Sequence, residues 1–311
     1  MNSIFEKYAA KKIDYINTQI LISWSGAAES SFKSNYNKNY VKVLERGSSH
    51  IEFQKKILEE EYKKFSIKRE VINKEVIEKE LREYELADYI MVPSLFAKKT
   101  FLEFGVKEEK IICIPYGVDL KEFNKNQKIH NNFIILNVGQ ISLRKGSYYL
   151  LKAFMDLNLK DCELHFVGNI DFDMKNIIGQ FKKNKNIKFF NHVPQNKLKN
   201  FYNNSDIFVI PSIEEGMAVV QLQAMACGLP VISTTNSGGS DIIDENENGY
   251  VIKIRDIEQL KKKISYLYYN RQVLKRFSEN SFIKANKFLS WDNYGDKISS
   301  LYSKIIRDIN S

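Results

Sequence analysis

The stretch of residues 207–243 constrains the fold of this chain most. It reads IFVIPSIEEGMAVVQLQAMACGLPVISTTNSGGSDII. A four-residue apolar run ends at Pro211, and a stretch of good helix formers follows an acidic turn. Gly228 and Pro230 stop that helix, and Val231 begins a second short strand. Two strands joined by one helix predict a βαβ unit.

The polar turns of this unit predict an edge that binds an anion. The carboxyl ends of parallel strands and the amino ends of the following helices share one edge of a sheet, where free N–H groups and the helix dipole favour negative charge. We expect the helix to open at Met217, Ala218 and Val219, with their N–H groups unpaired inside it. Glu215 lies just before them, and its carboxylate suits sugar hydroxyls rather than an anion.

The same segment resembles the donor-site signature of the retaining glycosyltransferases of family 4, the glycogen-synthase-like group with the GT-B fold. That signature has a glutamate, a glycine and a second glutamate eight positions after the first, followed by Ala-Met-Ala-x-Gly-x-Pro-Val. The first glutamate matches Glu215, and Gln223 stands at the second position. The resemblance implies that Glu215 contacts the donor sugar and Gln223 the ribose. An amide still accepts and donates hydrogen bonds but forms none assisted by its own charge, so we expect weaker rather than lost binding.

A second turn, GQISLRKG at residues 139–146, carries the resemblance further. Lys145 and the following glycine match the family's phosphate-contacting pair, while Gln140 stands where the family usually has an arginine. Arg144 is expected to supply the missing charge. A cation beside the diphosphate stabilises negative charge that develops on the leaving group. The implied substrate-binding residues are Gly139, Arg144, Lys145, Glu215, Gly216, Met217, Ala218, Val219 and Gln223, with the backbone of residues 237–239 completing the pocket.

The family also brings a histidine from the end of a first-domain strand to the reacting sugar. His50 is the candidate in this chain, but its context, LERGSSH, departs from the commoner pattern. Glu45 or Arg46 could face the cleft instead, and a lone histidine often has a structural role. The predicted catalytic residues are therefore Glu215, His50 and Lys145.

Strands and helices alternate in both halves of the chain. This predicts an α/β fold of two Rossmann-like, doubly wound parallel-sheet domains that face each other across a cleft. We expect an N-terminal, acceptor-side domain at residues 1–125, a C-terminal nucleotide-sugar-binding domain at 131–290, and a helix at 291–311 that crosses back. The interdomain linker is expected at residues 124–132. Predicted strands lie near residues 19, 41, 89 and 111 in the first half, and near residues 133, 164, 187, 207, 231 and 250 in the second.

The N-terminal domain is predicted to be shortened. Only four strands can be placed before the Gly-Val-Asp exit at residues 117–119, whereas the family's first domain begins with further βα units. A parallel sheet cut at this point has an open edge, which favours self-association or a partner chain.

Composition narrows the remaining function classes. The chain is 43% apolar, which is ample for two cores, and its three cysteines lack metal-ligand spacing, so reduced and buried thiols are expected. The net charge of +9 is spread over many lysines and is compatible with an anionic substrate or a peripheral membrane contact. No nucleic-acid-binding module is recognisable, and a diffuse basic face is the favoured interpretation of the charge. No apolar run suits a membrane span and no leader is recognisable, which predicts a cytoplasmic chain, with the inner face of the membrane left open.

The resemblance implies transfer of a hexose from a nucleotide diphosphate sugar to a glycan or lipid-linked acceptor, with retention of anomeric configuration. Cell-surface polysaccharide or lipopolysaccharide synthesis is the expected setting. No metal or other cofactor is predicted, since Asp171 and Asp173 form only a weak metal signal. Two rival functions stay open: a GT-B epimerase acting on the nucleotide sugar alone, and a non-catalytic or partner-dependent nucleotide-sugar-binding subunit. The sugar, base and acceptor depend on loop side chains outside the motif.

Overall fold

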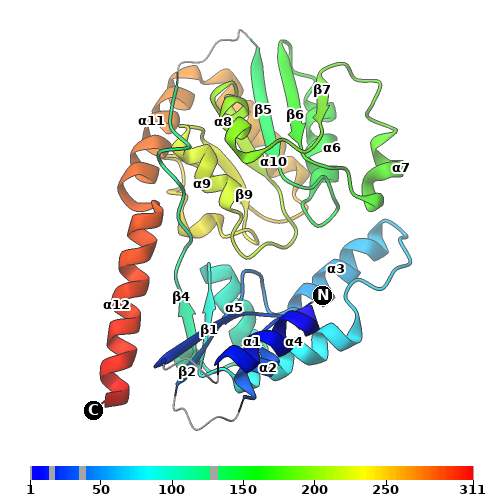
Figure 1. Ribbon diagram of the computed structural model, residues 1–311. Coiled ribbons are helices and arrows are strands. Elements are labelled where there is room, and N and C mark those ends of the chain that lie inside the picture. Colours follow the sequence, from blue (N-terminus) through cyan, green and yellow to red (C-terminus); the bar gives the residue numbers. More distant parts are fainter. Residues whose placement is uncertain (1, 14–17, 35–39, 127–131, 311) are drawn as a thin grey trace.

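The computed structural model describes residues 2–13, 18–34, 40–126 and 132–310. Two parallel sheets form two layered domains, one above the other in Figure 1. Part of the expected linker at residues 124–132 lies outside the described residues. Each strand that the sequence predicts is present, and each begins within two residues of its predicted position.

The N-terminal sheet has the strand order β1-β2-β3-β4, and all its pairs are parallel. Its strands are β1 (Ile20–Trp24), β2 (Val41–Glu45), β3 (Tyr89–Val92) and β4 (Ile111–Cys113). Its helices are α1 (Asn2–Ile13), α2 (Glu29–Phe32), α3 (Ile51–Lys64), α4 (Lys74–Leu86) and α5 (Leu95–Glu103).

The C-terminal sheet has the order β10-β9-β8-β5-β6-β7, again with parallel pairs throughout. Its strands are β5 (Phe133–Val138), β6 (Cys162–Val167), β7 (Ile187–Phe190), β8 (Ile207–Ile210), β9 (Val231–Thr234) and β10 (Gly249–Ile252). The helices are α6 (Ser147–Leu157), α7 (Lys175–Ile178), α8 (Gln195–Asn203), α9 (Val219–Ala226), α10 (Ile257–Tyr269), α11 (Arg271–Phe288) and α12 (Trp291–Asn310).

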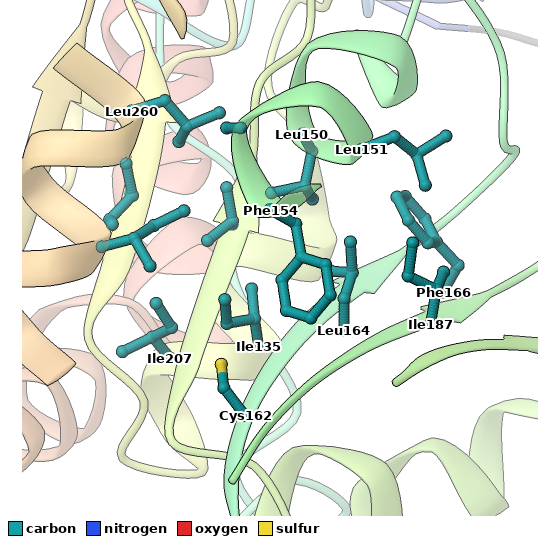
Figure 2. Close-up of a cluster of buried hydrophobic side chains, with 14 of the residues drawn as sticks. Ile135, Leu150, Leu151, Phe154, Cys162, Leu164, Phe166, Ile187, Ile207 and Leu260 are labelled. Atoms are coloured by element: carbon teal, nitrogen blue, oxygen red, sulfur yellow. The ribbon is translucent and has the colours of Figure 1, made fainter. Parts of the chain in front are cut away.

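Helices cover both faces of the C-terminal sheet, which explains why its strands read as continuous apolar runs. On one face, Leu150 and Phe154 of α6 pack with Ile135 and Leu164 of the sheet, as Figure 2 shows. On the other face, Leu136 joins a second core with residues of α9. The sheet is therefore a rigid platform for the turns at its carboxyl edge.

The N-terminal sheet is covered unequally. On one face Leu44 and Ile90 pack in a core with helix residues. On the other face Val43 is buried, but Ile22 and Trp24 of β1 are 44% and 57% exposed. Helix α12 leaves the C-terminal domain and runs alongside the N-terminal domain (Figure 1). Among the residues that the structure describes, β1 pairs with β2 alone, so the sheet has an open edge there.

Helix α3 joins the two domains. Its Ile57 and Leu58 pack against Tyr149 and Ile213 of the C-terminal domain. The carboxylate of Glu61, which is fully buried, accepts hydrogen bonds from Tyr149 Oη at 2.7 Å and from Arg255 Nε at 2.6 Å. The amphipathic pattern of α3 thus serves the interface between domains as well as its own domain.

The segment after β6 is less helical than the sequence suggests. A helix over residues 175–182 is predicted, but α7 ends at Ile178 and turns follow. Gly179 comes directly after α7, and glycine weakens a helix interior. Within the described ranges, no helix combines the length and apolar character needed to cross a membrane.

Candidate functional site

Two turns meet where the C-terminal sheet reverses its strand order. β5 pairs with β6 on one side and with β8 on the other, so the turns after β5 and β8 are neighbours at the carboxyl edge. Gly146 has φ 68°, and a Cβ there would collide with the carbonyl oxygen of Pro211. The Ile213 N–H donates to the Arg144 carbonyl oxygen at 2.8 Å. Only glycine permits this approach, which brings the two turns into contact.

The contact joins Lys145 to Glu215. Lys145 Nζ donates to Glu215 Oε2, and Arg144 Nη2 lies 3.8 Å from Glu215 Oε1. Burial, helped by the Arg144 guanidinium and opposed by the Glu214 carboxylate, lowers the pKa of Lys145 to about 7. The cation expected at the diphosphate and the carboxylate expected at the sugar are therefore direct partners.

The neighbouring Glu214 is a buried acidic residue of the candidate site that the sequence did not single out. Its side chain is fully buried and accepts from Arg144 Nε at 2.9 Å and from the hydroxyls of Ser48 and Ser49 at 2.7 Å each. The two serines donate to Oε1, and Gln54 Nε2 donates at 2.9 Å to Oε2, the oxygen that also accepts from Arg144. Burial favours the protonated acid, but Arg144 and the serine hydroxyls outweigh it and lower the pKa of Glu214 to about 2.

Glu214 changes the role expected of Arg144. The guanidinium is already engaged by a buried carboxylate, so it stands beside the Lys145–Glu215 pair and is not a free cation. The signal in the sequence was the doubled glutamate, of which the family signature uses only one. The burial of Glu214 depends on Ser48, Ser49 and Gln54 of the other domain, which lie far from it in the sequence.

Gln223 lies within α9 and is 8% exposed. Its Oε1 accepts a 2.9 Å hydrogen bond from the hydroxyl of Tyr202, which is fully buried against Phe123 and Phe208. A buried hydroxyl needs such an acceptor, so the amide oxygen is in use. The contact of Gln223 with a ribose stays a prediction.

The structure corrects the placement expected for His50. Its ring is 2% exposed, stacks on Phe104 at 4.7 Å and contacts Phe101 and Tyr84. Nδ1 accepts from the backbone N–H of Glu52 at 3.3 Å, so His50 is the N-cap of α3. Burial and, second, the Arg46 charge lower the pKa of His50 to about 4. The ring belongs to an aromatic core and does not have the exposure that contact with a sugar requires.

The two alternatives to His50 differ. Arg46 is 8% exposed and forms an ion pair with Glu80 at 2.7 Å, so it is part of the N-terminal core. Glu45 is half-buried at the end of β2, and its carboxylate has no hydrogen-bond or ion-pair partner among the residues described. Burial raises the pKa of Glu45. Of the two, only Glu45 presents a free polar group.

A pocket of about 350 Å³ opens beside the first residues of the GQISLRKG turn. Two of its lining residues, Gly139 and Gly168, approach each other closely, because the φ of Gly168 is 148° and a Cβ there would collide with the Gly139 carbonyl oxygen. Its lining residues are Val138, Gly139, Gln140, Val167, Gly168, Asn169, His192, Val193 and Leu198. The sequence did not single out this pocket, although its walls are the ends of three neighbouring strands and the turns that follow them.

Asp171 and Asp173 hold the same turn in place. Asp171 accepts from Gln140 Nε2 at 2.5 Å, while Asp173 Oδ2 accepts from the Leu143 N–H and the Tyr62 hydroxyl at 3.3 Å each. Burial, followed by the charge of Asp171, raises the pKa of Asp173 to about 6. In the described part of the chain, no three histidine, cysteine or acidic residues gather as a metal-ligand group.

Comparison with known proteins places this geometry in a family. The family model described as Glycosyl transferases group 1 matches residues 118–283. Spore coat protein SA of Bacillus subtilis is 28% identical in an alignment 229 positions long that covers 65% of this chain and 60% of that protein. The capsular polysaccharide biosynthesis glycosyltransferase CapM of Staphylococcus aureus is 25% identical over 65% of this chain and 57% of its own length. The chain thus spans less than two thirds of these relatives.

The fold has counterparts among solved structures. HepE of Anabaena, solved in complex with UDP and glucose, superposes with a TM-score of 0.79 and 14% identity, over 96% of this chain and 81% of HepE. The two parallel-sheet domains of this chain are therefore the GT-B fold. Since the family model covers more than half of its residues, the chain belongs to the group 1 glycosyl transferases.

Proposed function

We propose that this chain transfers a hexose from a nucleoside diphosphate sugar to a glycan or lipid-linked acceptor, with retention at the anomeric carbon, in the synthesis of a surface polysaccharide. The observation that carries the proposal is the contact between Lys145 and Glu215 at the switch point of the C-terminal sheet. Family membership, the name of CapM and the UDP and glucose bound to HepE support it.

Binding of the donor separates Lys145 from Glu215, because each of the two side chains binds a different part of the donor. Its diphosphate takes the Lys145 ammonium, and its sugar hydroxyls take the Glu215 carboxylate, so each charge exchanges one partner for another. The pocket beside Gly139 receives the base. Gln223 contacts the ribose, and the backbone of residues 216–219 closes around the sugar.

The transfer breaks the bond between the anomeric carbon and the diphosphate oxygen. The acceptor oxygen bonds to that carbon on the face that the diphosphate leaves, and the acceptor proton passes to the diphosphate. Lys145, backed by Arg144, stabilises the charge that develops on the leaving group. Glu215 holds the sugar in position while this happens.

Glu215→Ala tests the proposal. Transfer to acceptor should be lost, while UDP measured by calorimetry should bind as tightly as before or more tightly, because Lys145 is released from its partner. A parallel loss of UDP binding would show that Glu215 does not act on the sugar. Glu258→Ala, which removes an exposed carboxylate of α10, is the control and should change neither measurement.

A second candidate is a donor-binding chain that needs a partner chain for transfer. The open edge of β1, with Ile22 and Trp24 exposed, favours it. The observation that separates the two candidates is sugar transfer by the purified chain of these 311 residues. Transfer without any other protein would eliminate the partner-dependent subunit.

A further inference from the structure

We propose that a surface formed by Trp24, Tyr116, Trp291 and Tyr294 around the carboxylate of Glu45 binds the saccharide end of the acceptor. We call these five residues the acceptor surface. That its ligand is the acceptor rests on the proposed transferase function; that it binds a saccharide rests on its own geometry.

The aromatic residues come from three distant parts of the chain. The ring of Tyr116 lies 6.3 Å from that of Trp291 and 6.2 Å from that of Tyr294, and the last two are 5.3 Å apart. A Cβ built on Gly47 would lie 3.1 Å from the Tyr116 hydroxyl and 3.6 Å from the Trp24 ring, so these two residues flank the same glycine. Tyr116 thus connects the two tryptophans.

Both tryptophans of the chain are at this place, and both are exposed. Trp24 is 57% exposed and Trp291 43%. Large rings usually lose most of their exposure in a folded domain, so two exposed tryptophans in one cluster indicate a binding surface. Trp291 is the first residue of α12, so this helix begins on a side chain that remains open to solvent.

Glu45 lies among these rings. It stands directly beside Trp24 in the register of β1 and β2. Burial and, second, the charge of Glu45 raise the pKa of Tyr116, Tyr294 and Tyr302. No cation pairs with that carboxylate in the described structure, so it can accept hydrogen bonds from ligand hydroxyls.

The acceptor surface is continuous with the donor site. A Cβ on Gly216 would collide with the Gly47 carbonyl oxygen, so the two glycine backbones are in contact across the domain boundary. Gly216 directly follows Glu215, and Gly47 is flanked by Trp24 and Tyr116. A saccharide on the acceptor surface would therefore present its end toward the residue assigned to the donor sugar.

The chemistry of the acceptor surface selects a saccharide over other occupants. Aromatic faces pack against the C–H faces of a sugar ring, and a carboxylate accepts from its hydroxyls. An anionic membrane would be repelled by Glu45. Two copies that pair through this same surface would bring two Glu45 carboxylates together without a cation, at a cost in free energy.

The two tryptophans make the acceptor surface directly measurable. Because no tryptophan lies elsewhere in the chain, tryptophan emission reports on this surface alone. We would titrate the chain with methyl glycosides and disaccharides of glucose, galactose, mannose and N-acetylglucosamine, and measure UDP binding separately by calorimetry. At least one saccharide should give a saturable change in emission. Glu45→Gln should lower the affinity for that saccharide by about fivefold or more, the difference between a charged and a neutral hydrogen-bond acceptor. The affinity for UDP should stay unchanged.

Matched variants and alternative probes complete the test. Trp24→Ala should abolish saccharide binding, whereas Tyr269→Ala, which removes a 71% exposed ring in the C-terminal domain, should not affect it. The proposal would be overturned if none of the saccharides gave a saturable change in emission. It would also be overturned if only phosphatidylglycerol vesicles gave one, or if the change followed protein concentration and dimer formation in sedimentation. UDP binding without saccharide binding refutes the acceptor surface alone. Saccharide binding without UDP binding refutes the proposed donor site.

Discussion

The carboxylate of Glu214, in the turn after β8, accepts a 2.7 Å hydrogen bond from the hydroxyl of Ser49, which belongs to the other domain. A second buried glutamate crosses the boundary in the opposite direction, since Glu61 of α3 accepts from Arg255 of the C-terminal domain. Each carboxylate is completely buried and is satisfied only when the domains are together. Glu214 therefore holds the turn after β8 against the N-terminal domain, and Glu61 holds Tyr149 and Arg255 of the C-terminal domain against α3.

Glu214→Gln should lower the free energy of unfolding by about 3 kcal/mol, because it leaves Arg144 without its buried counter-charge. Urea denaturation measures this change, and small-angle scattering should show a more extended chain. Glu258→Gln removes one side of an exposed ion pair with Lys261 and should cost no more than about 0.5 kcal/mol. Equal effects of the two variants would mean that Glu214 does not fasten the domains.

Lys145→Ala should lower the affinity for UDP by about tenfold or more, because a charge-assisted hydrogen bond is lost. The affinity for uridine should change by no more than about twofold. The reason is that a point charge acts on phosphates only where phosphates are present. Calorimetry with both ligands checks this. Lys152→Ala, which removes an exposed lysine of the neighbouring helix α6, serves as the control. Unchanged UDP affinity in Lys145→Ala would remove this lysine from the donor site.

Gln223→Glu should tighten donor binding by on the order of 1 kcal/mol, since a carboxylate makes stronger hydrogen bonds to the ribose than an amide does. The Tyr202 hydroxyl can donate to either side chain, so the core contact survives the change. Tyr202→Phe tests whether that contact matters, and it should alter UDP affinity little. Weaker binding by Gln223→Glu would show that the site is built for an amide.

The buried ring of His50 should make the chain less stable in mild acid. Its pKa is about 4 in the folded chain and about 6.5 in the unfolded chain, so protons bind preferentially to the unfolded state between these values. This contribution is complete above pH 6.5 and is lost as the pH falls toward 4, by about 2 kcal/mol between pH 7 and 5. His50→Asn keeps an N-cap and should show a flatter pH dependence of the unfolding free energy. His192→Asn, at an exposed position, should keep the original slope.

UDP binding should survive a chelator, because we assign the diphosphate to Lys145 and Arg144. Asp171 and Asp173 are engaged with the turn that carries these cations. Calorimetry in EDTA, and again after excess magnesium, measures the dependence. Binding that disappears in EDTA and returns with magnesium would make the two aspartates metal ligands instead.

The sequence by itself determined the succession of strands along the chain and the two turns whose motifs resemble the family's donor site. Strands of a parallel sheet covered on both faces are apolar throughout, so each appears as a short run bounded by turn residues. Lys145 and Glu215 were candidates because the turns that carry them resemble two motifs of the family, and their roles at a donor stay predictions. Apolar runs, turn residues and motif matches are local properties, and local sequence records them.

The tertiary structure alone decided which polar groups are buried and which distant residues meet. His50 and Glu45 are five positions apart, yet one is enclosed by aromatic rings and the other has a free carboxylate. Glu214 and Glu215 are adjacent, yet one spans the domain boundary and the other contacts Lys145. Burial, pairing and the grouping of Trp24 with Tyr116 and Trp291 depend on contacts far apart in the chain. No local pattern specifies such contacts, because each one exists only after both domains have packed.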